Sequence, residues 1–131
     1  MNILKLQQGY LNALYNKFKR IQDIPAQSTN LTKGEIINYI KDQMLYLQLE
    51  IVELMVEIGN DDAAILKPWS ERHPTIALQK FEPTDRTKSE AIDCLRFCLN
   101  ICLAAGLTPD NIEQEFDKVW TRSITRLQDN Y

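Results

Sequence analysis

Glycine and histidine are both rare in this chain, which has four glycines and one histidine among 131 residues. Glycine commonly marks turns and bulges between strands, and no stretch alternates apolar and polar residues as a half-buried strand does, so an all-α chain is predicted. The single histidine, His73, disfavours a transition-metal site built on imidazole. It also disfavours a di-iron carboxylate bundle, which typically uses Glu-x-x-His motifs.

Long apolar runs and an excess of positive charge are also missing. The apolar segments fall well short of the roughly 20 residues that a membrane-spanning helix requires, and polar residues interrupt the N-terminal stretch where a signal peptide would be apolar. A net charge of −3 provides no overall positive field that would attract nucleic acid. We therefore expect a cytoplasmic protein (in the host cytoplasm if the chain is phage-encoded) that binds neither membranes nor nucleic acid.

The three cysteines, Cys94, Cys98 and Cys102, follow one another at intervals of four residues. On a helix this spacing places all three side chains on one face, pointing the same way, so they do not readily form a disulfide with each other. We interpret them as reduced, small side chains at a helix interface rather than as a metal site.

Apolar spacing and capping signals predict four long helices in a single domain over residues 1–131. They cover about residues 2–21, 32–58, 87–106 and 108–128. The second starts at the capping box Thr32-Lys33-Gly34-Glu35 and stops at Gly59-Asn60. The third starts at the capping box Thr87-Lys88-Ser89-Glu90, or slightly earlier at Thr84 or Asp85. The fourth opens at Thr108-Pro109, an N-cap followed by proline.

The connection over residues 59–86 is broken by prolines and is too long to be inert. Together with this connection, the four predicted helices indicate a four-to-five-helix bundle.

Acidic side chains interrupt the second helix where it is otherwise most apolar. Residues 44–58 are apolar on nearly every side, so this segment is expected to be buried all round. Glu50, Glu53 and Glu57 nevertheless share one stripe of it with Gln43. Burying several unpaired carboxylates costs several kcal/mol each, so either a positive group meets them or the stripe faces solvent.

The third helix carries a matching pair of carboxylates, Glu90 and Asp93, and Asn100 extends their stripe by two turns. If the two helices pack together, four carboxylates face one another and repel unless cations lie between them. Hard oxygen ligands of this kind select Mg²⁺ or Mn²⁺.

The two acidic pairs, Glu50-x-x-Glu53 and Glu90-x-x-Asp93, resemble the ExxE…ExxD signature of the all-α NTP pyrophosphohydrolases, the superfamily of MazG-like proteins and dimeric dUTPases. Three further segments are similar to the dimeric dUTPase branch: Gln8-x-x-Leu11-Asn12, Lys67-Pro68-Trp69, and the C-terminal tail with Arg126 and Tyr131. The large helical insertion of full-length dimeric dUTPases is missing, so the chain looks like a compact, phage-type member.

The resemblance implies a magnesium-dependent nucleoside triphosphate pyrophosphohydrolase, which converts a (d)NTP to the (d)NMP and pyrophosphate. Glu50, Glu53, Glu90 and Asp93 would hold two or three Mg²⁺ ions (Mn²⁺ as the alternative), and Glu50 or Glu53 would activate the attacking water. The candidate phosphate-binding residues are Lys67, Lys118, Arg122, Arg126 and Tyr131, among which Arg122 rests on helical spacing alone. The candidate base-binding residues are Gln8, Asn12, Trp69 and Asn100.

Two questions stay open at the level of sequence. The substrate is either dUTP or a purine (d)NTP such as dGTP. A non-enzymatic helical interaction module is the alternative from another functional class. Because residues 44–58 are apolar almost all round, the chain has more apolar surface than one small bundle buries, which predicts a homodimer or homotetramer.

Overall fold

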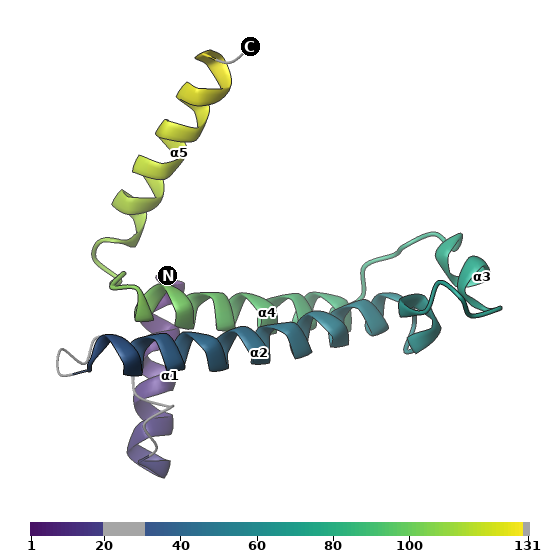
Figure 1. The fold of residues 1–131 in the computed structure, drawn as a ribbon, viewed down its shortest axis with the longest axis horizontal. Coiled ribbons are helices and arrows are strands. Elements are labelled where there is room, and N and C mark those ends of the chain that lie inside the picture. The colour runs from purple at the N-terminus through teal and green to yellow at the C-terminus, as the bar shows by residue number, and fades with distance from the viewer. Residues whose placement is uncertain (20–30, 130–131) are drawn as a thin grey trace.

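The computed structural model describes residues 1–19 and 31–129. These residues form five α-helices and one short 3₁₀ helix, with no strand among them (Figure 1). The elements are α1 (Ile3–Phe18), α2 (Lys33–Ile58), η2 (Ala63–Leu66), α3 (His73–Ala77), α4 (Asp85–Ala104) and α5 (Ile112–Asp129). The predicted all-α class is therefore confirmed for the described ranges, in which no helix has the length and apolar character needed to cross a membrane.

Side-chain caps set the ends of the long helices. The Thr32 hydroxyl accepts the backbone N–H of Glu35 at 3.1 Å, and the Glu35 carboxylate accepts the backbone N–H of Thr32, so the predicted capping box of α2 is confirmed. The α4 helix begins at the earlier of the predicted starts, because Thr84 caps it: its hydroxyl accepts the N–H of Thr87 at 3.1 Å.

Two predicted boundaries differ from the structure. Helix α1 ends at Phe18, where Lys19 adopts a left-handed conformation with φ 58°, and the predicted end at residue 21 lies outside the described residues. Helix α5 begins at Ile112 rather than Thr108, because Thr108 and Asn111 bond each other's backbone N–H and close a turn before the helix.

The α2 and α4 helices lie side by side and antiparallel, as a long hairpin (Figure 1). Three contacts along the hairpin join Glu57 with Arg86, Tyr46 with Phe97, and Gln43 with Asn100. The 11 residues from Glu57 back to Tyr46 match the 11 from Arg86 to Phe97, and the three from Tyr46 to Gln43 match the three from Phe97 to Asn100. Equal steps of this kind are typical of a coiled-coil seam. This seam carries polar, charged and aromatic side chains in place of the usual aliphatic ones.

Helix α1 crosses one end of the hairpin (Figure 1). Its Leu4 and Leu11 pack with Leu99 and Leu103 of α4, and these four residues form the buried apolar core. Leu4 and Leu103 are essentially inaccessible to solvent. This core holds α1 against α4 and so positions the polar side chains of α1 beside the seam.

One chain does not close into the predicted bundle. Helix α5 extends away from the other helices and has no buried residue (Figure 1). The expectation that residues 44–58 are buried all round is also wrong for a single chain, because α4 covers only one side of α2. The large apolar side chains exposed on α2 in this segment are Met44, Leu45, Leu49, Ile51, Val52, Met55 and Ile58.

Candidate functional site

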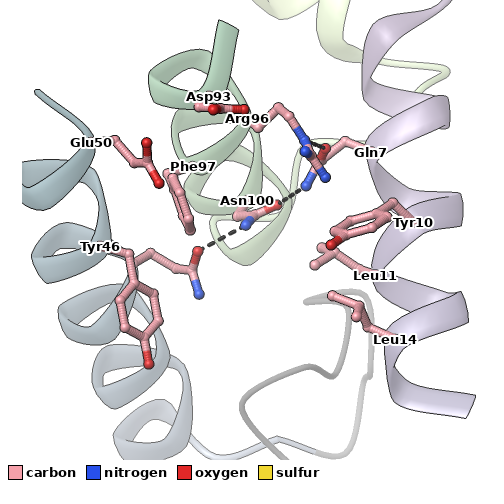
Figure 2. A pocket seen from close by; sticks show the side chains of 11 residues that line it. Gln7, Tyr10, Leu11, Leu14, Tyr46, Glu50, Asp93, Arg96, Phe97 and Asn100 are labelled. Carbon is pink, nitrogen blue, oxygen red and sulfur yellow. Dashed lines mark hydrogen bonds between the residues drawn. The ribbon is translucent and has the colours of Figure 1, made fainter. Parts of the chain in front are cut away.

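The two acidic pairs meet across the seam of the hairpin. One carboxylate oxygen from each of Glu50, Glu53 and Glu90 lies within 4.8 Å of the other two. Asp93 comes from α4 on the side facing Glu50 (Figure 2). We call Glu50, Glu53, Glu90 and Asp93 the carboxylate cluster. The structure thus brings together three of the four residues that the sequence predicted as metal ligands, and the charge of the fourth, Asp93, acts on Glu50.

The carboxylate cluster is electrostatically unsatisfied. Burial raises the pKa of Glu50, and the adjacent Glu53 carboxyl and the charge of Asp93 raise it further. Within the described residues, Glu50 Oε2 and Glu90 Oε2 are buried without a hydrogen-bond partner. Buried polar atoms normally have a partner, and unpaired carboxylate oxygens are especially costly. The donor set, all carboxylate oxygen, fits a hard divalent cation such as Mg²⁺.

A cation of the chain itself satisfies the next carboxylate along the seam. Arg86 of α4 contacts Glu57 at 3.1 Å and Asp61 at 3.2 Å, at the end of the hairpin. Burial and the neighbouring Asp61 raise the pKa of Glu57, whereas the Arg86 guanidinium lowers it. Glu57 therefore belongs to an ion pair that joins α2 to α4, which distinguishes it from the carboxylate cluster.

Buried amides continue the seam on the other side of the carboxylate cluster. Arg96 Nε donates to Gln7 Oε1 at 3.1 Å, and Gln7 Nε2 donates to Asn100 Oδ1 at 2.8 Å. Asn100 Nδ2 in turn donates to Gln43 Oε1 at 2.8 Å. The amides come from α1, α4 and α2, and each is at most 6% exposed. We call Arg96, Gln7, Asn100 and Gln43 the amide chain; it ties three helices together.

A single cavity of about 400 Å³ joins the amide chain to the carboxylate cluster. Glu50 and Asp93 lie at one end of it, and the side chains of α1 lie across from them (Figure 2). Its aromatic lining includes Phe97 and Tyr46, whose ring centroids are 5.8 Å apart, and Tyr10. The volume lies in the range of small-molecule sites, and the lining combines carboxylates, amides, a guanidinium and rings. Such a site can hold a planar polar group beside a charged one.

The α1 residues that line the cavity are neighbours of the predicted ones. Gln7 and Leu11 line it, whereas Gln8 is partly exposed, Asn12 is exposed, and neither contributes to the lining. Successive helical residues differ by about 100° around the axis, so a shift of one position moves a side chain off the face that meets α4. Of the four predicted base-binding residues, only Asn100 lies in the cavity.

The predicted phosphate-binding residues do not gather at the cavity. Lys67 is exposed at the end of η2, and Trp69, the remaining predicted base-binding residue, is 81% exposed in the loop that follows. The three basic residues of α5, including Lys118, are exposed on a helix that extends away from the hairpin (Figure 1). Lys118 contacts Glu115 of its own helix at 3.1 Å. The other two are Arg122 and Arg126. Tyr131 lies outside the described residues.

Eight cavity residues were not among the predicted site residues. They are Gln7, Tyr10, Leu11, Leu14, Gln43, Tyr46, Arg96 and Phe97. A signal for three of them, Gln43, Tyr46 and Phe97, was present. The α2 positions 43, 46, 50, 53 and 57 and the α4 positions 86, 90, 93, 97 and 100 have mirrored spacings. When the two acidic pairs are aligned in antiparallel order, the remaining positions of the two series also lie opposite one another. No spacing rule within the hairpin indicates the other five, which are Arg96 and the four α1 residues.

The cysteines are free thiols in the structure. Cys94 is partly buried near the carboxylate cluster, and burial, followed by the charge of Glu50, raises its pKa. Burial also raises the pKa of Cys102. These thiols are therefore protonated and poorly nucleophilic at neutral pH, as expected for packing side chains.

Comparisons of the chain with protein-family models, with curated proteins and with solved structures gave no match. The likeness to the all-α NTP pyrophosphohydrolases therefore remains a resemblance carried by short motifs. Any assignment of activity has to rest on the carboxylate cluster, the amide chain and the cavity between them.

Proposed function

We propose that this protein is a magnesium-dependent nucleoside triphosphate pyrophosphohydrolase, a compact member of the all-α superfamily that it resembles. The observation that carries the proposal is the shared cavity, in which the carboxylate cluster and the amide chain lie beside each other. A nucleotide has the same two parts, a polyanion that needs cations and a planar base that needs hydrogen-bonding groups and aromatic surfaces. Few other small molecules combine these requirements.

The carboxylate cluster is the part suited to the triphosphate. Glu50, Glu53, Glu90 and Asp93 would hold Mg²⁺, with Mn²⁺ as the alternative. When bound, the metal would supply charge neutralisation for the phosphates and for the leaving pyrophosphate and would activate a water molecule. Glu50 lines the cavity and has a raised pKa, so among the glutamates it is the best candidate to accept the proton of that water.

The amide chain is the part suited to the base. Asn100 and Gln7 are held in place by their hydrogen bonds, so they present fixed polar atoms rather than mobile ones. The rings of Tyr46 and Phe97 offer apolar faces on which a base can stack. Base binding by Gln7 and Asn100 replaces the assignment to Gln8 and Asn12 in this proposal.

We further propose that a second copy of the chain covers the exposed apolar faces, giving a homodimer or homotetramer. On α5, Phe116 is 71% exposed and Trp120 is 56% exposed, and α2 also leaves large apolar side chains uncovered. Soluble monomers rarely expose apolar surface of this extent. Lys118, Arg122 and Arg126 do not reach the cavity within one chain, so their predicted contact with phosphate requires another subunit.

A product assay tests the proposed reaction. Purified protein is incubated with the eight common (d)NTPs and with dUTP in the presence of Mg²⁺, and pyrophosphate and orthophosphate are resolved. At least one nucleotide should yield pyrophosphate and the monophosphate, and EDTA should stop the reaction. Orthophosphate as the primary product, or undiminished turnover in EDTA, would overturn the proposal.

A further inference from the structure

The amide chain has a direction, and Arg96 imposes it. A guanidinium group donates hydrogen bonds and accepts none, so Gln7 must turn its oxygen toward Arg96. Gln7 then has only its nitrogen left for Asn100, and Asn100 has only its nitrogen left for Gln43. The orientation of each amide is set by the preceding residue of the amide chain. The first of these residues is Arg96, whose guanidinium can only donate.

Both ends of the amide chain consequently offer donors to the cavity. At one end, Gln43 accepts through Oε1, which leaves Nε2 with no hydrogen bond in the described part of the chain. At the other end, Arg96 uses Nε for Gln7, and its two terminal nitrogens make no hydrogen bond with described residues. The Arg96 guanidinium lies 4.3 Å from the centre of the Tyr10 ring, which holds it over that ring. Gln43 and Arg96 both line the cavity.

We infer that the cavity selects nucleotides whose base carries a carbonyl oxygen, at C6 of a purine or C4 of a pyrimidine, over those with an amino group there. The inference rests on the proposed function in one respect, namely that the ligand is a nucleotide. Guanine, hypoxanthine, uracil and thymine present an acceptor at this position, whereas adenine and cytosine present a donor. A donor from the base placed against the amide donor of Gln43 would leave both groups without a partner.

Arg96 is a positioning residue in this scheme. Through Gln7 and Asn100 it determines whether Gln43 presents its nitrogen or its oxygen to the cavity, although Arg96 and Gln43 do not bond each other. In Arg96→Glu, an acceptor replaces the donor at the start of the series. Gln7, Asn100 and Gln43 then turn over in succession, and Gln43 presents its oxygen to the cavity. In Gln43→Glu, the last member alone changes from donor to acceptor with almost no change in shape. Both variants should move selectivity in the same direction.

The test compares bases that differ at this one position and does not require hydrolysis. Dissociation constants of dUMP and dCMP, and of dIMP and dAMP, are measured by calorimetry with Mg²⁺ present. Wild type should bind the carbonyl base of each pair about tenfold or more tightly, the factor expected for one matched hydrogen bond. Gln43→Glu and Arg96→Glu should each lower this ratio about tenfold or invert it, whereas Arg96→Lys, which keeps a donor, should preserve it.

Gln48→Glu is the matched control, since Gln48 is exposed on α2 and does not line the cavity. It introduces the same charge and should leave the ratio unchanged. The inference is overturned if wild type binds both members of a pair with equal affinity. It is also overturned if Gln43→Glu lowers the affinity for all four nucleotides by the same factor. Carbonyl preference without pyrophosphate release would refute only the proposed reaction. Pyrophosphate release without base preference would refute only the inference, and so would pyrophosphate release without binding of any of the four monophosphates.

Discussion

The carboxylate cluster and the amide chain occupy the same seam and have side chains of nearly the same shape, yet their polar atoms are satisfied in opposite ways. In the amide chain every link is a hydrogen bond of 2.8 to 3.1 Å between a donor and an acceptor. In the carboxylate cluster two buried oxygens have no partner among the described residues, and the neighbouring charges repel. The hydrogen bonds of the amide chain stabilise the fold, whereas the unpaired oxygens and like charges of the carboxylate cluster cost free energy. Side-chain changes in the two regions should therefore have opposite effects on stability.

The largest expected effect is the loss of turnover in Glu50→Gln. Glu50 is a proposed metal ligand, and the loss of a ligand that would support several kcal/mol of charge stabilisation in the transition state should lower pyrophosphate release about a thousandfold. In EDTA the variant should be at least as stable as wild type, because one member of a repelling group has become neutral. Thermal unfolding should also show that Mg²⁺ stabilises wild type, by about 2.7 kcal/mol at a hundred times the dissociation constant, and stabilises the variant much less. A variant that melts far below wild type in EDTA while keeping its activity would place Glu50 in a structural role.

The matching change in the amide chain should destabilise the protein. Asn100→Ala leaves Gln7 Nε2 and Gln43 Oε1 buried without their partner, and each such loss costs about 1–3 kcal/mol. We expect the free energy of unfolding to fall by about 2–4 kcal/mol, with or without Mg²⁺. Asn38→Ala, an exposed change on α2, is the control and should stay within about 0.5 kcal/mol of wild type. Equal stabilities of the two variants in urea titrations would show that the amide chain contributes nothing to the fold.

A smaller effect concerns pH in the absence of metal. Burial raises the pKa of Glu50 above its ordinary value of 4.5. Between the ordinary pKa and the pKa in the folded state, the folded protein therefore binds a proton more readily than the unfolded chain does. The stability that this proton confers is fully present below pH 4.5 and is lost as pH rises through the folded pKa. In EDTA, the advantage of Glu50→Gln over wild type should therefore be largest near neutral pH and shrink as the solution is acidified. An advantage that grows on acidification would contradict the sign of this shift.

The smallest expected effect on the stability of a single chain is at α5. Phe116 and Trp120 are exposed, so changing both to serine removes little packing and should alter unfolding of the helical hairpin by less than about 0.5 kcal/mol. The same double variant should weaken assembly, because it deletes apolar surface that a second copy would cover. Light scattering should report a mass above 15.2 kDa for wild type at micromolar concentration and a lower mass for the variant. A wild-type monomer under these conditions would refute the proposed oligomer.

Local signals predicted the helices and the acidic pairs correctly. The Thr32 capping box and the Gly59 stop bracket α2 because capping depends on hydrogen bonds within a few residues. The carboxylates that meet at the seam were also recognisable, since residues three apart on a helix share a face whatever packs against it. The start of α5 was less predictable, because the Thr108–Asn111 turn competes with the first helical turn, and both use the same residue types.

The amino-acid sequence by itself determined the capped start of α2 and its end at Gly59, which side chains share a face, and that two acidic pairs lie on two apolar helices. Tertiary structure alone decided that Gln7 rather than Gln8 enters the cavity, that Arg96 heads the amide chain, and that α5 stands apart from the hairpin. The reason is physical. Helical periodicity depends on the backbone of one segment, whereas the choice between faces about 100° apart depends on which neighbouring helix buries more apolar surface. For α1 that neighbour is α4, through Leu4, Leu11, Leu99 and Leu103, and their packing turns Gln7 toward Asn100.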